Sequence, residues 1–270
     1  MPRIPPPLKT TFEKCREREF LCLDEIDATI AAMEQTRYPI RNKAIAMLLF
    51  SQALQPVELS WLRWCDVDFA EKVLRVVRNR QKARNSRQLT VNLQRLSAAE
   101  IEILQQLQEE STTDWMFASE RQQRLSDRSL RHLIQQAGEI AELAVSVHPY
   151  MLRRSGLYLR SALLLQPLEL SLHQCCLLWN WYATTASFSP QQWQEVSAIS
   201  PKTADAFHEA LRQLQAFTGI QQYEHLIDYL LGAFSLFPQL EDIPKNYWLA
   251  PTGWVNPTLP KRFRERLAPS

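Results

Sequence analysis

One pair of alternating segments, set between long runs of helical periodicity, constrains the fold of this chain most. Residues 73–78 (VLRVVR) and 88–93 (QLTVNL) alternate as strands do, and the polar stretch 79–87 between them is expected to form a turn. An order of helices, one hairpin and further helices differs from the strand–helix alternation of nucleotide-binding α/β folds. The sequence therefore predicts a mainly α fold with a small antiparallel β-hairpin or sheet.

Apolar residues recur at helical spacing on both sides of this hairpin. Ser97 followed by Glu100 is the pattern of a capping box, which marks a helix start. We expect Asp66 to Asp68 to end the helix that begins at Pro56, and Pro190 to close the helical region before the C-terminal part. The predicted helices cover residues 24–35, 40–54, 56–64, 97–110, 126–144, 151–165, 168–178, 203–216 and 221–236.

Glycine is scarce in this chain, with five residues among 270 against sixteen prolines. The sequence holds no GxGxxG or GxxxxGK[ST] loop to cradle a phosphate, which excludes most ATP- and dinucleotide-dependent chemistry. The five cysteines show no CxxC pair and no metal-ligand spacing, and their odd number favours a reducing cytosol. We expect a cytoplasmic protein with no membrane span, no cofactor, no metal and no small-molecule substrate.

The basic residues are unevenly placed, although the net charge is only +2. No acidic residue occurs between Leu74 and Ala99. A local basic stripe favours phosphate contact, because counterion release is a local effect. The alternative interpretation is a solvated surface hairpin. The stripe consists of Arg75, Arg78, Arg80, Lys82, Arg84, Arg87 and Arg95.

Three stretches, in order, carry a resemblance to a known family. They are residues 18–69, which contain ALQPVELSWLRWCDVDF, the hairpin of residues 73–91, and residues 147–159 (VHPYMLRRSGLYL). This ordered set resembles the tyrosine recombinases and integrases, with their GLRxxELxxLRWxDxD phrase, lysine-bearing β-hairpin and HPHMLRH box. The likeness covers residues 18–195 and is greatest to the short fimbrial phase-variation recombinases. It implies the tyrosine-recombinase catalytic-domain fold plus a C-terminal helical extension.

The resemblance also implies a site that cuts and rejoins DNA through a phosphotyrosine. In such a site a tyrosine attacks a backbone phosphorus, and two arginines neutralise the resulting phosphorane. A lysine on the hairpin protonates the leaving oxygen, a histidine acts as acid and base, and a second histidine or a tryptophan hydrogen-bonds the scissile phosphate.

Most of these positions are changed in this chain. The first arginine falls on Gln55, the first histidine on Tyr150, the second histidine on Asn180 and the nucleophile on Phe188. Gln55 carries no charge and Phe188 has no hydroxyl, so the covalent path is lost. The resemblance therefore implies a pseudoenzyme of the site-specific recombinases. The family residues that remain are Glu58, Lys82 and Arg153.

A second alignment leaves catalysis open. His173 and Tyr182 lie nine positions apart, which is the family's spacing from the second histidine to the nucleophile. His173 lacks the preceding glycine, however, and Tyr182 precedes the ATT stretch instead of following it. Trp181 and Tyr182 are more simply explained as core or interface aromatics. Tyr150 is expected either as a buried aromatic at a helix start or, as we favour, as a side chain that fills the vacated catalytic pocket.

The leading hypothesis is an inactive recombinase homologue that binds DNA, an active recombinase or another protein partner. The alternatives are a protein-interaction scaffold with no DNA role, and an active recombinase that uses Tyr182. We expect a flexible lead-in over residues 1–19, a catalytic-fold domain over 20–195, and an extension over 196–270 that docks on a neighbouring protomer or partner recombinase. The predicted DNA contacts, mainly to phosphates, are Arg80, Lys82, Arg84, Arg87, Arg128, Arg131, Arg153 and Arg154.

Overall fold

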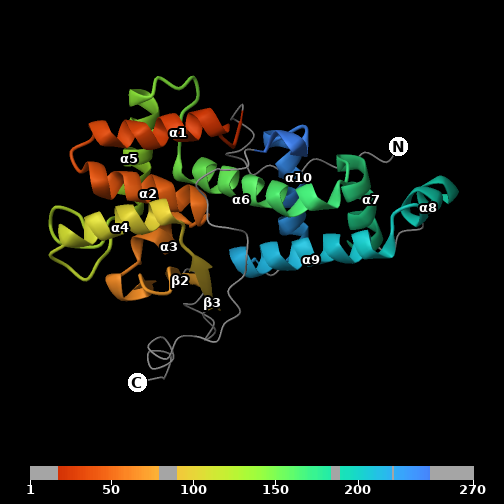
Figure 1. Cartoon of the computed structure of the whole chain (residues 1–270). Coiled ribbons are helices and arrows are strands. Elements are labelled where there is room, and N and C mark those ends of the chain that lie inside the picture. The colour runs from red at the N-terminus through yellow and green to blue at the C-terminus, as the bar shows by residue number, and fades with distance from the viewer. Residues whose placement is uncertain (1–17, 79–89, 184–188, 221, 244–270) are drawn as a thin grey trace.

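The computed structural model describes residues 18–78, 90–183, 189–220 and 222–243. These residues form a mainly helical body with one small sheet, as the sequence predicts (Figure 1). The helices are α1 (Leu23–Ala32), α2 (Pro39–Ser51), α3 (Pro56–Ser60), α4 (Ala98–Glu109), α5 (Asp127–Ile140), α6 (Pro149–Leu165), α7 (Leu172–Ala183), α8 (Pro190–Ser197), α9 (Pro201–Thr218) and α10 (Tyr223–Leu236).

The sheet has three antiparallel strands in the order β1 (Val67–Asp68), β2 (Val73–Arg78) and β3 (Thr90–Arg95). In the register of the two longer strands, Val77 faces Val91 and Arg78 faces Thr90. The predicted hairpin is therefore confirmed in its two strands, while its turn lies outside the described residues. Strand β1 is an addition, since residues 66–68 were expected only to end a helix, and Val67 pairs with Leu74 instead.

Helix α8 is a second addition, and its local chemistry explains it. Pro190 was expected to close this region, but proline at the first turn of a helix loses no intrahelical hydrogen bond. Ser189 caps the helix, because its side chain accepts a hydrogen bond from the backbone N–H of Gln192. The expected capping box at Ser97 and Glu100 is confirmed at the start of α4.

Helix α6 runs through the centre of the molecule and organises its packing (Figure 1). It packs against α2 along one part of its length and against α10 along another. At Gly156 the two backbones of α6 and α2 come so close that an added Cβ would lie 1.8 Å from the Phe50 carbonyl oxygen. Only glycine permits this crossing, so the crossing point of the two helices is fixed by that residue.

The C-terminal helices share the core of the preceding residues. Leu226, Leu230 and Ala233 of α10 are buried in the same hydrophobic cluster as Leu152 and Leu157 of α6. Helix α9 also contacts α6, and its C-terminal end reaches β3. The proposed boundary between residues 195 and 196 stays a prediction, but the described part of the extension packs on its own chain. Within the described ranges, no helix has the length and apolar character that crossing a membrane requires.

Candidate functional site

The start of α3, the end of β2 and the first half of α6 converge on one buried carboxylate, that of Glu58. Gln55 stands at the N-cap position of α3, and its backbone N–H donates a hydrogen bond to Glu58 Oε2 at 2.8 Å. The ion pair of Glu58 Oε2 with Arg78 Nη1 measures 2.5 Å, and Arg153 Nη1 lies 3.8 Å from the same oxygen. The structure thus brings together Gln55, Glu58 and Arg153, as the resemblance implies, and adds Arg78.

Arg78 is fully buried; its Nη1 and Nη2 are hydrogen-bonded inside the protein, whereas its Nε has no hydrogen-bond partner among the described residues. Its Nη2 donates to the Phe217 carbonyl oxygen at the end of α9, at 2.8 Å, and to the Gln52 carbonyl oxygen at 3.4 Å. Burial lowers the pKa of Arg78, and the Glu58 carboxylate counteracts this shift. An arginine keeps its charge under these conditions, so Arg78 and Glu58 form a buried ion pair.

Arg153 is also in the interior, at 4% exposure. Its Nη1 donates to the Ala53 carbonyl oxygen and faces Glu58. The prediction that Arg153 contacts a DNA phosphate stays a prediction; in this structure buried groups of the same chain take up its guanidinium. Its role here is to hold α6 against the α2–α3 junction.

A second buried polar cluster lies next to the first. The Nε and Nη2 atoms of Arg160 donate to the Ser51 carbonyl oxygen at 3.1 and 2.7 Å, and its guanidinium stacks 3.9 Å from the centre of the Phe217 ring. Burial lowers the pKa of Arg160 to about 10, against the opposing effect of Glu100. The Glu100 carboxylate in turn accepts hydrogen bonds from the side chains of Ser51 and Gln52.

The C-terminal end of α9 closes this side of the molecule. The Phe217 carbonyl oxygen accepts hydrogen bonds from Arg78 and from the side-chain amides of Asn92 and Gln94 on β3, both at 3.1 Å. Gly219 ends the helix with φ of +69°, and an added Cβ would lie 2.9 Å from Arg78 Cγ. The last carbonyls of α9 carry partial negative charge, and they therefore contact the cationic side chain of Arg78 at the end of β2.

Tyr150 lies at the surface above this cluster instead of filling a pocket. Its side chain is 49% exposed, which makes the favoured interpretation as a pocket-filling aromatic wrong. Partial burial raises the pKa of Tyr150, while Arg153 and Arg131 lower it and Asp127 and Glu58 raise it. Helix α5 contacts both α3 and α6, so it borders the face above Glu58.

The other predicted phosphate contacts differ in exposure, and some of them lie outside the described residues. Arg128 and Arg131 are exposed on α5. Arg154 is partly buried on α6 and interacts with Tyr158. In the predicted basic stripe, Arg95 is exposed, whereas Arg75 is turned to Asp66 at 2.6 Å. The remaining predicted residues lie outside the described part of the chain: Arg80, Lys82, Arg84, Arg87 and, at the nucleophile position, Phe188.

The residues of the second alignment all lie on α7, away from Glu58. Helix α7 packs against α8, α9 and α10, and Figure 1 shows it at the far end of α6 from α3 and β2. His173 is exposed and pairs with Glu195 of α8 at 2.8 Å. Helix α7 thus lies away from the start of α3, where Gln55 stands (Figure 1). Within the described ranges, no three His, Cys, Asp or Glu residues are grouped as a metal site.

Arg78 is the residue of the site that sequence reasoning missed. It was assigned to the basic stripe, where arginines were taken as surface groups. The signal was nevertheless available, because Arg78 follows Leu74 and Val76 at every second position of a strand and so shares their face. All three side chains are fully buried.

Comparisons of this sequence with a family model and with individual proteins point to the same family. The Phage integrase family matches residues 19–159. The chain is 25% identical to the type 1 fimbriae regulatory protein FimB of Escherichia coli strain K12 over 140 residues, which is 52% of this chain and 70% of FimB. It is 34% identical to the tyrosine recombinase XerC of Shewanella amazonensis over 116 residues, which is 43% of this chain but only 38% of XerC.

Solved structures show the same fold at low sequence identity. The XerA recombinase structure matches with a TM-score of 0.51 and 17% identity, over 78% of this chain and 59% of XerA. The Tn1549 transposon integrase, solved in complex with transposon right end DNA, matches with a TM-score of 0.50 and 11% identity, over 79% of this chain and 62% of the integrase. Since the family match alone spans more than half of its 270 residues, this chain belongs to the phage integrase family, the family of the tyrosine recombinases.

Proposed function

We propose that this protein binds DNA, alone or with an active recombinase, and does not cleave it. The supporting observation is the composition of the face above Glu58. Arg128 and Arg131 are exposed there, and their spacing of three residues puts them on the same side of α5. Tyr150 is exposed beside Arg131, so this face offers two cations and a phenol to a phosphate backbone.

The absence of cleavage in this proposal rests on the chemistry of the same site. Gln55 brings no positive charge, and the guanidiniums of Arg78 and Arg153 are buried against Glu58. Stabilising a phosphorane needs donors that face the reacting group, and one missing donor of this kind typically slows a reaction by about 10²–10³. Phe188 at the nucleophile position removes the phosphotyrosine path itself.

Two other functions remain as candidates. A protein-interaction scaffold without DNA binding is favoured by the net charge of only +2 and by Gln55. An active recombinase would have to use Tyr182 on α7, away from Arg153 in the described arrangement. A partner surface within residues 196–270 and a cytoplasmic location belong to this proposal as well, since recombinases act where DNA is accessible. Light scattering of the full chain, with and without duplex DNA, tests the partner surface through the assembly mass.

The test of DNA binding is a salt titration with a short duplex. Each phosphate contact contributes about −0.9 to the slope of log K against log [salt] for duplex DNA. Arg128→Ala and Arg131→Ala should each reduce the slope by about 0.9, which weakens binding about eightfold at about 0.1 M salt. The control is Arg212→Ala, which removes one exposed positive charge from α9. No binding of the unmutated chain at about 50 mM salt would favour the scaffold.

The test of cleavage is covalent capture on a nicked suicide substrate. We expect no protein–DNA adduct with the unmutated chain. An adduct that disappears in Tyr182→Phe would overturn the non-cleaving proposal and establish the second alignment.

A further inference from the structure

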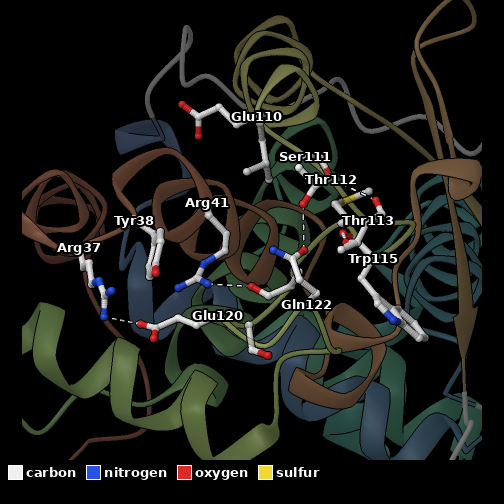
Figure 2. A pocket seen from close by; sticks show the side chains of 14 residues that line it. Arg37, Tyr38, Arg41, Glu110, Ser111, Thr112, Thr113, Trp115, Glu120 and Gln122 are labelled. Atoms are coloured by element: carbon white, nitrogen blue, oxygen red, sulfur yellow. Dashed lines mark hydrogen bonds and ion pairs between the residues drawn. The ribbon is translucent and has the colours of Figure 1, made fainter.

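A polar cavity of about 460 Å³ lies apart from the Glu58 cluster, between the start of α2 and the segment that follows α4. Its volume is in the range of small-molecule sites and exceeds what one phosphate group alone would need. Arg37, Tyr38 and Arg41 form one wall, and residues 110–113, 118–120 and 122 form the other (Figure 2). Leu107, Trp115 and Met116 add apolar surface.

Arg41 is the charged centre of this cavity. Its guanidinium lies 4.4 Å from the centre of the Tyr38 ring, its Nε donates to Asn42 Oδ1 at 3.0 Å, and its Nη1 donates to the Ala118 carbonyl oxygen at 2.7 Å. Within the described chain, Nη2 has no hydrogen-bond partner and no carboxylate lies within 4.0 Å of Arg41. Burial lowers the pKa of Arg41, while Tyr38 and Glu120 raise it. The residue is thus a positioned, partly desolvated cation.

Arg37 provides a second cation on the same aromatic ring. Its guanidinium lies 5.3 Å from the centre of the Tyr38 ring, so two guanidiniums share one ring. Figure 2 shows Tyr38 between Arg37 and Arg41. Among the described residues, Arg37 has an ion pair with Glu120 at 2.5 Å, and Arg41 has none. That pair is solvent-exposed and therefore weak, so an anionic ligand can displace it.

The other groups around the cavity add hydrogen-bond donors. The Gln122 side chain accepts from Thr112 through Oε1 at 2.9 Å, which leaves its amide NH₂ as a donor. The Ser119 hydroxyl has no side-chain hydrogen bond among the described residues. Glu110 is the remaining acidic residue, and Figure 2 shows its carboxylate at the edge, directed away from Arg41. With Glu120 neutralised by Arg37, the inner charge of the cavity is that of Arg41.

We propose that this cavity binds the phosphate group of a phosphorylated ligand, with Arg41 as the main contact and Arg37 as the second. A phosphate dianion is held by Arg41 Nη2 and replaces Glu120 at Arg37, and the polar remainder of the ligand meets Gln122 and Ser119. The phosphate belongs either to a free phosphorylated small molecule or to a DNA backbone. The site is separate from the α5 face, so its test does not depend on the DNA-binding proposal.

The experiment is calorimetric titration of the full chain with inorganic phosphate and with glycerol phosphate at constant ionic strength. We expect saturable binding that is at least tenfold weaker in Arg41→Met and partly kept in Arg41→Lys. Glu120→Gln should bind severalfold more tightly, because the competing carboxylate is gone. Arg121→Met is the matched control, since Arg121 is exposed next to Glu120 but does not line the cavity.

The outcomes separate clearly. No saturable binding, equal affinity in Arg41→Met, or weaker binding in Glu120→Gln would each overturn the proposal. Urea unfolding of Arg41→Met shows whether a loss of phosphate binding comes from a folding defect. If that variant is unfolded, the phosphate affinity of Glu120→Gln tests the proposal in its place. A duplex that loses affinity in Arg41→Met and competes with phosphate identifies the group as a backbone phosphate. A duplex that does neither identifies a free phosphorylated molecule.

Discussion

The ion pair between Arg78 and Glu58 makes a quantitative prediction about stability. Arg78→Met keeps most of the side chain that packs on Gly219 but removes the guanidinium. Glu58, at 3% exposure, then retains the N–H of Gln55 and the Arg153 guanidinium at 3.8 Å. Removing one partner of a buried pair typically costs about 3–5 kcal/mol, because the other charge stays buried. Since Arg153 remains, we expect the lower end, about 3 kcal/mol.

The partner substitution completes a double-mutant cycle. Glu58→Gln keeps an oxygen that can accept from the Gln55 N–H, so it mainly removes the charge. We expect a similar loss for Glu58→Gln, and a double variant that is about 2–3 kcal/mol more stable than the sum of the two losses predicts. Domains typically unfold at a cost of about 5–15 kcal/mol, so each single variant should still fold.

Urea unfolding of the full chain, followed by far-UV circular dichroism, gives the four free energies. Losses that add within about 0.5 kcal/mol would refute the reasoning, because additivity is the behaviour of independent sites. A loss below about 1 kcal/mol for Arg78→Met would refute it too, since an exposed pair behaves in that way.

Three further variants test separate features by the same unfolding measurement. Gly219→Ala should cost about 1–2 kcal/mol, because its φ of +69° disfavours a side chain and Arg78 Cγ leaves no room; an unchanged stability would contradict this geometry. Ser97→Ala should cost about 1 kcal/mol, because Ser97 Oγ accepts from the Glu100 N–H at 3.2 Å. Burial raises the pKa of Cys175 from 9.0 to about 12, so the folded thiol keeps its proton above pH 9 while the unfolded one loses it. The protonated thiol therefore contributes its full stability below pH 9, and this stability falls as the pH rises above 9. The free energy of unfolding of the unmutated chain, relative to that of Cys175→Ala, should fall by about 1.4 kcal/mol from pH 8 to pH 10.

Much of the fold could be predicted because its signals are local. The capping box at Ser97, the helical periodicity around the hairpin and the proline at the start of α3 each depend on residues close in sequence. Glu58 and Arg153 could be placed together because the motif order of the family carried them. Helix α8 was missed because Pro190 permits both a stop and a start, and the sequence pattern did not decide between them.

The parts of the site that could not be predicted depend on contacts between distant segments. The burial of Arg153 follows from its place between Glu58 and the Ala53 carbonyl, and neither contact is visible in the HPYMLRR stretch. Tyr150 is exposed because Pro149 is buried and Met151 packs inward at the start of α6, which turns the tyrosine outward. The bonding of Arg78 to Phe217 joins residues 139 positions apart, beyond the reach of any local pattern.

The packing of the end of α9 against β3 also has a consequence for biosynthesis. Asn92 of β3 bonds to the carbonyl of Ala216, 124 residues later in the chain. At typical synthesis rates of about 5–20 residues per second, the acceptor emerges about 6–25 s after the donor. For that interval the side-chain amides of Asn92 and Gln94 lack their acceptors on α9 and have only water or a chaperone to bind, while Arg78 has Glu58 but not the Phe217 carbonyl. The nascent strands must stay solvated until the ribosome has delivered the end of α9.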